Sequence, residues 1–314
     1  LDLVDQGAVP LARIDDAVRR ILRVKLRAGL FEQPASQGRW AGRVDALDAR
    51  ALARQAVRQS LVLLKNRGGL LPLRRPARLL VVGKSADSLQ HQTGGWTLTW
   101  QGTDNTHADF PAGCSVLGGL RAALGAGAVV HSETAEGVDV AGFDAVVAVL
   151  GETPYAEGAG DIAAPATLHH ASRHPEDAAV LRRVAGHGVP VATVLLSGRP
   201  LLCNDLLNLS DAFVAAWMPG SEGDGVADLL LRDAAGQVAH AFSGRLPFAW
   251  PGAGGSTLWP RGHGLASGEA ADLGRLDETV PQAAVPDGGS LLLFDRMVAV
   301  PGTLCLAAVA GGGD

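Results

Sequence analysis

Short apolar runs alternate with amphipathic segments over most of the chain. Five continuous apolar runs predict β-strands at residues 61–64, 79–82, 145–150, 191–196 and 212–216. Continuous runs are typical of parallel strands that are covered on both faces. Apolar residues at helical spacing between these runs predict helices near 115–124, 176–186 and 222–232. This alternation predicts an α/β fold with a doubly wound, mostly parallel sheet between two helical layers.

The first sixty residues have a different pattern, with two predicted helices joined by a polar linker. In residues 11–29, apolar side chains recur at helical spacing, with acidic residues early and basic residues late, which suits the helix dipole. Gly29 suits the end of this helix. Little sequence precedes the helix to cover its apolar stripe, so we expect it to be the last helix of another domain. Residues 34–45 predict the linker, and a second helix is expected from about Asp48 to Ser60.

The last sixty residues lose the strand–helix alternation. Residues 251–289 are rich in Gly, Pro and Ala and predict a linker or an irregular wrapping segment. Two strands are expected at residues 290–300 and 303–309, which are too few for a stable domain. We therefore expect three parts: the remnant of another domain with a linker at 1–40, an α/β sandwich at 41–252, and a linker with a partial β-rich domain at 253–314.

Composition narrows the classes of partner. The 314 residues are 47% apolar and 19% charged, which is enough for one large or two ordinary domains. The net charge of -5 and the lack of a dominating basic run give no reason to expect nucleic acid. No apolar run reaches transmembrane length, so no membrane partner is expected. Cys114, Cys203 and Cys305 lie far apart without a CxxC pair, which favours free thiols. Because the chain opens without Met, in helical sequence, its compartment cannot be inferred from the lack of a signal peptide.

A loop with two tryptophans follows the second predicted strand, at residues 91–102. Trp96 and Trp100 lie among Gly, Thr and Gln, and flat indole faces can stack on the C–H faces of sugars. The alternative is that both rings fill a core.

An acidic loop, residues 151–161, directly follows the third predicted strand and carries Glu152, Glu157 and Asp161. Glycoside hydrolysis needs one carboxyl group that protonates the leaving oxygen and a second on the opposite side of the anomeric carbon. A mobile loop suits the acid, and a nearby indole such as that of Trp100 could raise its pKa by burial. The alternative is a solvated acidic loop. Since ligands bind beyond the carboxyl ends of parallel strands, we expect these loops to share one edge of the sheet.

Two further strand ends carry polar residues. Residues 217–223 open a helix, for which Ser221 is the expected N-cap and Glu222 a first-turn residue with a structural role. Arg199 closes another strand and either pairs with a carboxylate of the acidic loop or is exposed.

Cofactor and metal signals are weak. No GxGxxG sequence leads from a strand into a helix, which argues against a dinucleotide site. His169, His170 and His174 cluster in sequence, but no helix register or acidic partner supports a metal site. We expect neither a metal nor a cofactor.

Taken together and in this order, the segments resemble glycoside hydrolase family 3 from Gly7 to about Pro251. The resemblance rests on the segments Ala12–Leu22, Ser60–Asn66, Leu71–Leu73, Gly95–Gly102, Gly151–Asp161, Ser197–Pro200 and Pro219–Gly223. The first of them resembles the helix that closes the barrel domain of the family, and the others resemble its α/β domain. The similar subgroup is that of the exo-acting β-glucosidases and β-glucan glucohydrolases, which are retaining enzymes.

The resemblance implies roles for individual residues. It implies that Glu157 is the general acid/base and that Trp100, with Trp96, binds the sugar. It implies a supporting role for four loop residues, Glu152, Asp161, Arg199 and Glu222. The family nucleophile is an Asp in a Ser-Asp-Trp motif of the barrel, and no such motif occurs in this chain. Ser210-Asp211 is followed by Ala and is no substitute.

The partners implied by the resemblance are a β-glucoside or β-glucan oligosaccharide and a missing N-terminal barrel domain, in a periplasmic or secreted protein. The chain alone is then expected to be inactive. Two alternatives stay open. One is another specificity within the family, such as β-xylosidase. For β-N-acetylglucosaminidase the loop Tyr155–Glu157 is unfavourable, because the acid/base there commonly belongs to the barrel. The other alternative is a non-catalytic α/β module that binds sugars through Trp96 and Trp100.

Overall fold

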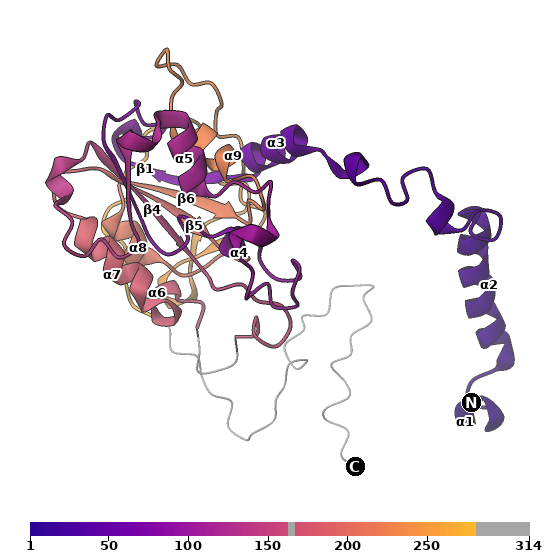
Figure 1. Cartoon of the computed structure of the whole chain (residues 1–314). Helices are drawn as coiled ribbons and strands as arrows, with labels where there is room; N and C mark the ends of the chain where they lie inside the picture. Colours follow the sequence, from indigo (N-terminus) through magenta and orange to yellow (C-terminus); the bar gives the residue numbers. More distant parts are fainter. Residues whose placement is uncertain (163–166, 281–314) are drawn as a thin grey trace. The chain divides into compact units, whose positions relative to one another are not determined.

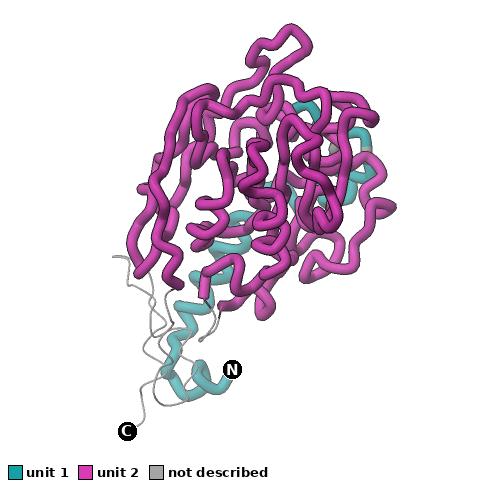
Figure 2. Tube along the Cα trace, turned by 90° about the vertical axis from the view of Figure 1, so that its left-hand side faces the viewer, with its two compact units in different colours: residues 1–52 teal, residues 53–314 magenta. Residues whose placement is uncertain are grey.

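The computed structural model describes residues 1–162 and 167–280. The chain divides into two compact units, of which the first is residues 1–52 and the second starts at Ala53 (Figure 2). We describe the two units separately.

The first unit is helical and confirms the predicted helix. A short α1 (Asp2–Asp5) precedes α2 (Leu11–Arg27), and Gly29 follows α2 in the left-handed conformation expected at a helix end. The apolar stripe of α2 is exposed along its length, at Leu11, Ile14, Val18, Ile21 and Leu22. Two 3-10 turns, η1 (Ala35–Gln37) and η2 (Val44–Leu47), lie in and just after the expected linker.

The second unit is built on a six-stranded sheet with the order β1-β6-β5-β4-β2-β3. The strands are β1 (Val62–Asn66), β2 (Leu79–Val82), β3 (Val129–Ser132), β4 (Ala145–Gly151), β5 (Val191–Leu196) and β6 (Ala212–Trp217). Strand β1 runs antiparallel to β6, and all other neighbours are parallel. The five predicted strands and the mostly parallel α/β class are confirmed. The sixth strand, β3, is a half-buried edge strand that carries no continuous apolar run.

Helices cover both faces of this sheet. The helices described from Arg50 to Leu230 are α3 (Arg50–Ser60), α4 (Leu89–Thr93), α5 (Val116–Leu124), α6 (His170–Arg173), α7 (Pro175–Val184), α8 (Asn204–Leu209) and α9 (Gly223–Leu230). Helices α5 and α9 lie on one face, and α7 and α8 lie on the other (Figure 1).

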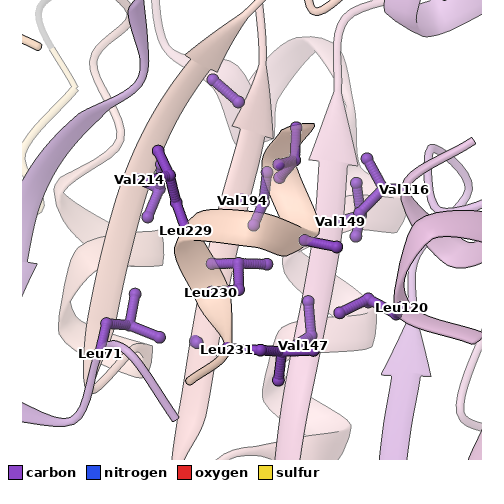
Figure 3. Packing of buried hydrophobic residues seen from close by; sticks show 14 of the residues in the cluster. Leu71, Val116, Leu120, Val147, Val149, Val194, Val214, Leu229, Leu230 and Leu231 are labelled. Atoms are coloured by element: carbon purple, nitrogen blue, oxygen red, sulfur yellow. The ribbon is translucent and has the colours of Figure 1, made fainter. Parts of the chain in front are cut away.

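Alternate residues of the five predicted strands enter the two separate cores. Val147, Val194 and Val214 pack with Leu120 and Leu229 on one face (Figure 3). Their neighbours along the strands, among them Val146, Leu195 and Phe213, pack against α7 and α8 on the other face. A strand buried on both faces must be apolar at every position, which is why the strands could be predicted from continuous apolar runs.

After α9 the chain is mostly irregular. A small hairpin of β7 (Trp250–Pro251) and β8 (Thr257–Trp259) packs on the second core, and residues 265–271 then run beside β1. The strands predicted at 290–300 and 303–309 lie outside the described residues, as does Cys305. Cys203 is buried and Cys114 is half-buried, and neither is in a disulfide in the described part of the chain.

Helices long and apolar enough to span a membrane do not occur within residues 1–162 and 167–280.

Candidate functional site

The candidate site lies beyond the carboxyl ends of β2, β4 and β5, where a doubly wound sheet binds its ligands. We name residues 94–102 the tryptophan loop and residues 151–161 the acidic loop. The tryptophan loop follows α4, and the acidic loop leaves β4 at Gly151. The structure brings the two loops together, as the strand-end argument predicts, through hydrogen bonds from Trp100 and Gln101 to Glu157.

The tryptophan loop holds an unusual backbone. Trp96 and Leu98 have positive φ angles of 60° and 62°, which bulky residues seldom adopt. A hydrogen bond from the Thr99 N–H to the Thr97 carbonyl (2.8 Å) closes a tight turn around Leu98, and one from the Trp96 N–H to the Trp100 carbonyl (2.9 Å) closes the loop. Strained backbone of this kind is concentrated at functional sites.

This backbone presents two indoles to solvent. Trp96 is 69% exposed and Trp100 is 57% exposed, with ring centroids 6.3 Å apart and planes tilted by 48°. The alternative that both rings fill a core is therefore wrong. Two exposed and adjacent aromatic faces suit an amphipathic ligand such as a sugar.

The inner end of the acidic loop is anchored by a buried carboxylate. Glu152 is only 2% exposed, and its Oε1 accepts a hydrogen bond from Arg173 at 2.7 Å. Its Oε2 accepts from the hydroxyl of Tyr155 at 2.9 Å and from the N–H of Gly198 at 3.2 Å. The guanidinium of Arg199 lies 3.7 Å from Oε1. Of the two alternatives left open for Arg199, the pairing with a loop carboxylate is thus the one found, but Arg173, which the sequence did not indicate, makes the shorter contact.

Tyr155 links this anchor to the rest of the loop. Its hydroxyl accepts a hydrogen bond from Arg199 Nε at 2.6 Å, and the same guanidinium lies 4.1 Å from the ring centroid. Burial raises the pKa of the Tyr155 hydroxyl, and the neighbouring Glu152 adds to the rise. There is no room for a side chain around it: a Cβ at Gly95 would lie 2.0 Å from the Tyr155 carbonyl oxygen, and one at Gly198 would lie 2.6 Å from its hydroxyl.

Glu157, at the outer end of the loop, is exposed. The indole N–H of Trp100 donates a hydrogen bond to its Oε2 at 2.8 Å. This hydrogen bond favours the charged form and lowers the pKa of Glu157. The expected neighbourhood of indole and carboxylate is therefore present. The expected direction of the pKa shift was wrong, because the indole contributes a hydrogen bond to the carboxylate and does not bury it.

Gln101 is a residue of the site that the sequence reasoning missed. Its Oε1 accepts a hydrogen bond from the Ala156 N–H at 2.7 Å, and its Nε2 donates to the Glu157 carbonyl at 3.0 Å. The one signal in the sequence is its position directly after Trp100.

The remaining predicted residues have other surroundings. The side chain of Asp161 is exposed, and its backbone N–H donates to the Gly158 carbonyl. Ser221 is not the N-cap of α9, because the helix begins one residue later with Glu222 in that position. Glu222 is buried and accepts a hydrogen bond from the Ser221 hydroxyl at 3.0 Å. Their segment reaches α4, which precedes the tryptophan loop, through the backbone of Gly220, which is hydrogen-bonded to Gln92.

One of the clustered histidines, His170, supports the start of the acidic loop through Asp177. Buried Asp177 accepts hydrogen bonds from the Gly151 N–H at 3.1 Å and from His170 Nε2 at 2.7 Å. Burial lowers the pKa of His174, at the start of α7, to about 4, and the charge of Lys84 adds to the shift. Nowhere in residues 1–162 and 167–280 do three or more His, Cys, Asp or Glu side chains form a group that could hold a metal ion.

Comparison with known proteins identifies this arrangement. The family model described as the glycosyl hydrolase family 3 C-terminal domain matches residues 61–279. The "Lysosomal beta glucosidase" of Dictyostelium discoideum is 34% identical over 284 residues, which cover 83% of this chain and 33% of that protein. A "Beta-xylosidase" of Formosa agariphila is 27% identical over 253 residues, with 74% of this chain and 33% of that protein covered.

Solved structures agree. The exo-1,3/1,4-beta-glucanase of a Pseudoalteromonas species superimposes with a TM-score of 0.77 at 40% identity, over 89% of this chain and 37% of that one. The beta-glucosidase of Listeria innocua in complex with glucose gives a TM-score of 0.62 at 30% identity, over 80% of this chain and 33% of that one. This chain spans about a third of the length of its curated relatives. It belongs to glycosyl hydrolase family 3 and contains the C-terminal α/β domain of that family.

Proposed function

We propose that this chain supplies the general acid/base and a sugar-stacking surface to a retaining, exo-acting β-glucosidase or β-glucan glucohydrolase. Glu157 is the acid/base, and Trp100 with Trp96 stacks on the sugar. One observation carries the proposal: the 2.8 Å hydrogen bond from the Trp100 indole to Glu157, which sets a carboxylate at the edge of an exposed aromatic surface. A sugar stacked on these rings would have its glycosidic oxygen beside the carboxyl group.

The reaction then has two steps. In the first, the protonated Glu157 donates its proton to the leaving oxygen while a second carboxylate attacks the anomeric carbon. In the second, ionised Glu157 takes a proton from the water that hydrolyses the glycosyl–enzyme intermediate. We propose that the second carboxylate, about 5–5.5 Å away, belongs to a barrel domain. On this proposal residues 1–40 close that barrel and residues 41–252 form the sandwich.

The Trp100 hydrogen bond has a consequence for this cycle. By lowering the pKa of Glu157 it favours the carboxylate, which is the form needed in the second step. Protonation for the first step requires that the pKa rise when the site is covered. Exclusion of water by the sugar and the barrel would have that effect, because burial disfavours a charged carboxylate.

The test uses a protein in which this domain is joined to its barrel. We expect Glu157→Gln to slow hydrolysis of glucosides with poor leaving groups by a factor of about 10²–10⁴, and to slow activated aryl glucosides much less. Azide should partly restore the second step. Glu136→Gln, at an exposed carboxylate outside both loops, is the control and should retain its activity.

The same assays separate the alternatives. The Formosa relative makes β-xylosidase the second candidate, and a higher kcat/KM for aryl β-xylosides than for aryl β-glucosides would select it. The 314-residue chain alone should not hydrolyse aryl β-glucosides. Sugar binding by this chain that survives Glu157→Gln, in a protein without glycosidase activity, would select a non-catalytic binding module.

A further inference from the structure

Gln101 contacts the backbone on both sides of the peptide that joins Ala156 to Glu157. Its amide oxygen accepts from the Ala156 N–H at 2.7 Å, and its amide N–H donates to the Glu157 carbonyl at 3.0 Å. One side chain thereby bridges a backbone donor and a backbone acceptor of two consecutive residues in the acidic loop. These contacts fix the position of the Glu157 Cα without touching its carboxyl group.

The residue before Gln101 holds the other end of the same glutamate. Trp100 donates from its indole to Glu157 Oε2 at 2.8 Å. Two consecutive residues of the tryptophan loop therefore hold Glu157 at its carbonyl and at its carboxylate, and hold the preceding Ala156 at its N–H. The ligand-stacking ring and the carboxylate are held in register by this contact.

Other restraints on Glu157 are weak. The side chain is exposed, and Gly158 follows with a positive φ of 80° and open space around it. The two loops also approach too closely for a side chain, because a Cβ at Gly95 would lie 2.0 Å from the Tyr155 carbonyl oxygen. The tryptophan loop thus brings Gln101 to the acidic loop. Without the contacts of Gln101, Glu157 could rotate about a glycine-rich backbone.

We infer that Gln101 is a positioning residue for the acid/base Glu157, an inference that rests on the proposed function. The two hydrogen bonds of Gln101 hold the backbone from which the carboxyl group of Glu157 extends. Their loss should affect catalysis strongly, because a misplacement of about 1 Å in a reacting group can cost on the order of 10²-fold in rate.

The first measurement uses the 314-residue chain. Gln101→Ala should speed hydrogen exchange of the Trp100 indole N–H and raise the pKa of Glu157 toward its ordinary value, both followed by NMR. Gln101→Glu keeps the hydrogen-bond acceptor and loses the donor, so it should speed exchange of the indole N–H less than Gln101→Ala does. The matched control is Gln90→Ala. Gln90 also accepts a hydrogen bond from a backbone N–H, that of Asn105, and among the described residues its side chain makes no hydrogen bond to the acidic loop.

The second measurement uses the protein joined to its barrel. Gln101→Ala should lower kcat for glucosides with poor leaving groups by about 10- to 100-fold, with a smaller loss for activated aryl glucosides. A purely structural role would lower both alike. If Glu157→Gln shows the leaving-group effect and Gln101→Ala behaves like Gln90→Ala in both measurements, the inference is wrong. If Glu157→Gln shows no leaving-group effect, the proposed function fails and the catalytic role of Gln101 fails with it.

Discussion

The two ends of the acidic loop carry the same residue type in opposite surroundings. At the inner end, Glu152 is buried and bound to Arg173, Tyr155 and the backbone of Gly198. At the outer end, Glu157 is exposed and held by contacts from the tryptophan loop. The same loop therefore has a fixed inner end and an exposed outer end. The carboxylate of Glu152 makes structural contacts that anchor the backbone of the loop, and the exposed carboxylate of Glu157 can contact a ligand.

The largest expected effect comes from removing the inner charge. Glu152→Gln leaves Arg173 and Arg199 without their carboxylate, and breaking a buried ion pair costs on the order of 3 kcal/mol. Urea unfolding of the chain, followed by circular dichroism, measures this loss. Glu157→Gln is the matched control and should leave the free energy of unfolding nearly unchanged, as expected for an exposed site. Equal losses for the two variants would remove the distinction between the two ends.

A second effect is expected from acid, at two buried histidines. Burial lowers the pKa of His91 and His174 to about 4, from the ordinary value of 6.5, and the charge of Lys84 adds to both shifts. At pH values between about 4 and 6.5, these two histidines therefore bind protons in the unfolded chain and stay neutral in the folded chain. Their contribution to the free energy of unfolding is complete above pH 6.5, is lost as the pH falls from 6.5 to about 4, and does not change further below that.

Unfolding in urea at about pH 7 and about pH 4.5 measures this pH dependence. The decrease in unfolding free energy between the two values should be smaller in His174→Gln than in the original chain. His187→Gln, at an exposed histidine, serves as the control for a surface position. An unchanged decrease in His174→Gln would show that the buried histidines do not couple the start of the acidic loop to pH.

The smallest effect concerns the outer end. Trp100→Phe removes the indole N–H that favours the charged form, so the pKa of Glu157 should rise toward its ordinary value in an NMR titration. Trp96→Phe should raise it less, since the indole of Trp96 makes the weaker contribution. A pKa that is unchanged in Trp100→Phe would mean that the hydrogen bond is not formed in solution. Because Glu157 is exposed, unfolding free energies should not separate these two variants.

Elements whose burial leaves a local pattern in the sequence could be predicted, and elements without such a pattern could not. Strands buried on both faces leave continuous apolar runs, so β4 and β5 could be predicted, whereas the half-buried edge strand β3 could not. The six-residue α8 is buried on most sides and shows no amphipathic period, and it was missed for that reason.

The candidate site divides in the same way. The meeting of Trp100 and Glu157 follows from topology, because the ends of parallel strands share one edge. The anchoring of Glu152 depends on Arg173, which lies in α6, and no spacing in the sequence predicts that contact. The predicted direction of the Glu157 pKa shift was also wrong, because a sequence does not show whether an indole turns its face or its N–H toward a carboxylate.

The segment that runs beside β1 has a consequence for association between copies. Strand β1 is one end of the sheet, and its outer backbone groups would be free without residues 265–271. The Leu265 N–H donates to the Leu63 carbonyl at 2.9 Å, and Ala271 and Asn66 exchange two further hydrogen bonds. Open strand edges recruit strands from other molecules and seed aggregates. A chain shortened to end before Leu265 would expose the outer edge of β1. By covering this edge, residues 265–271 prevent strands of other molecules from pairing with it.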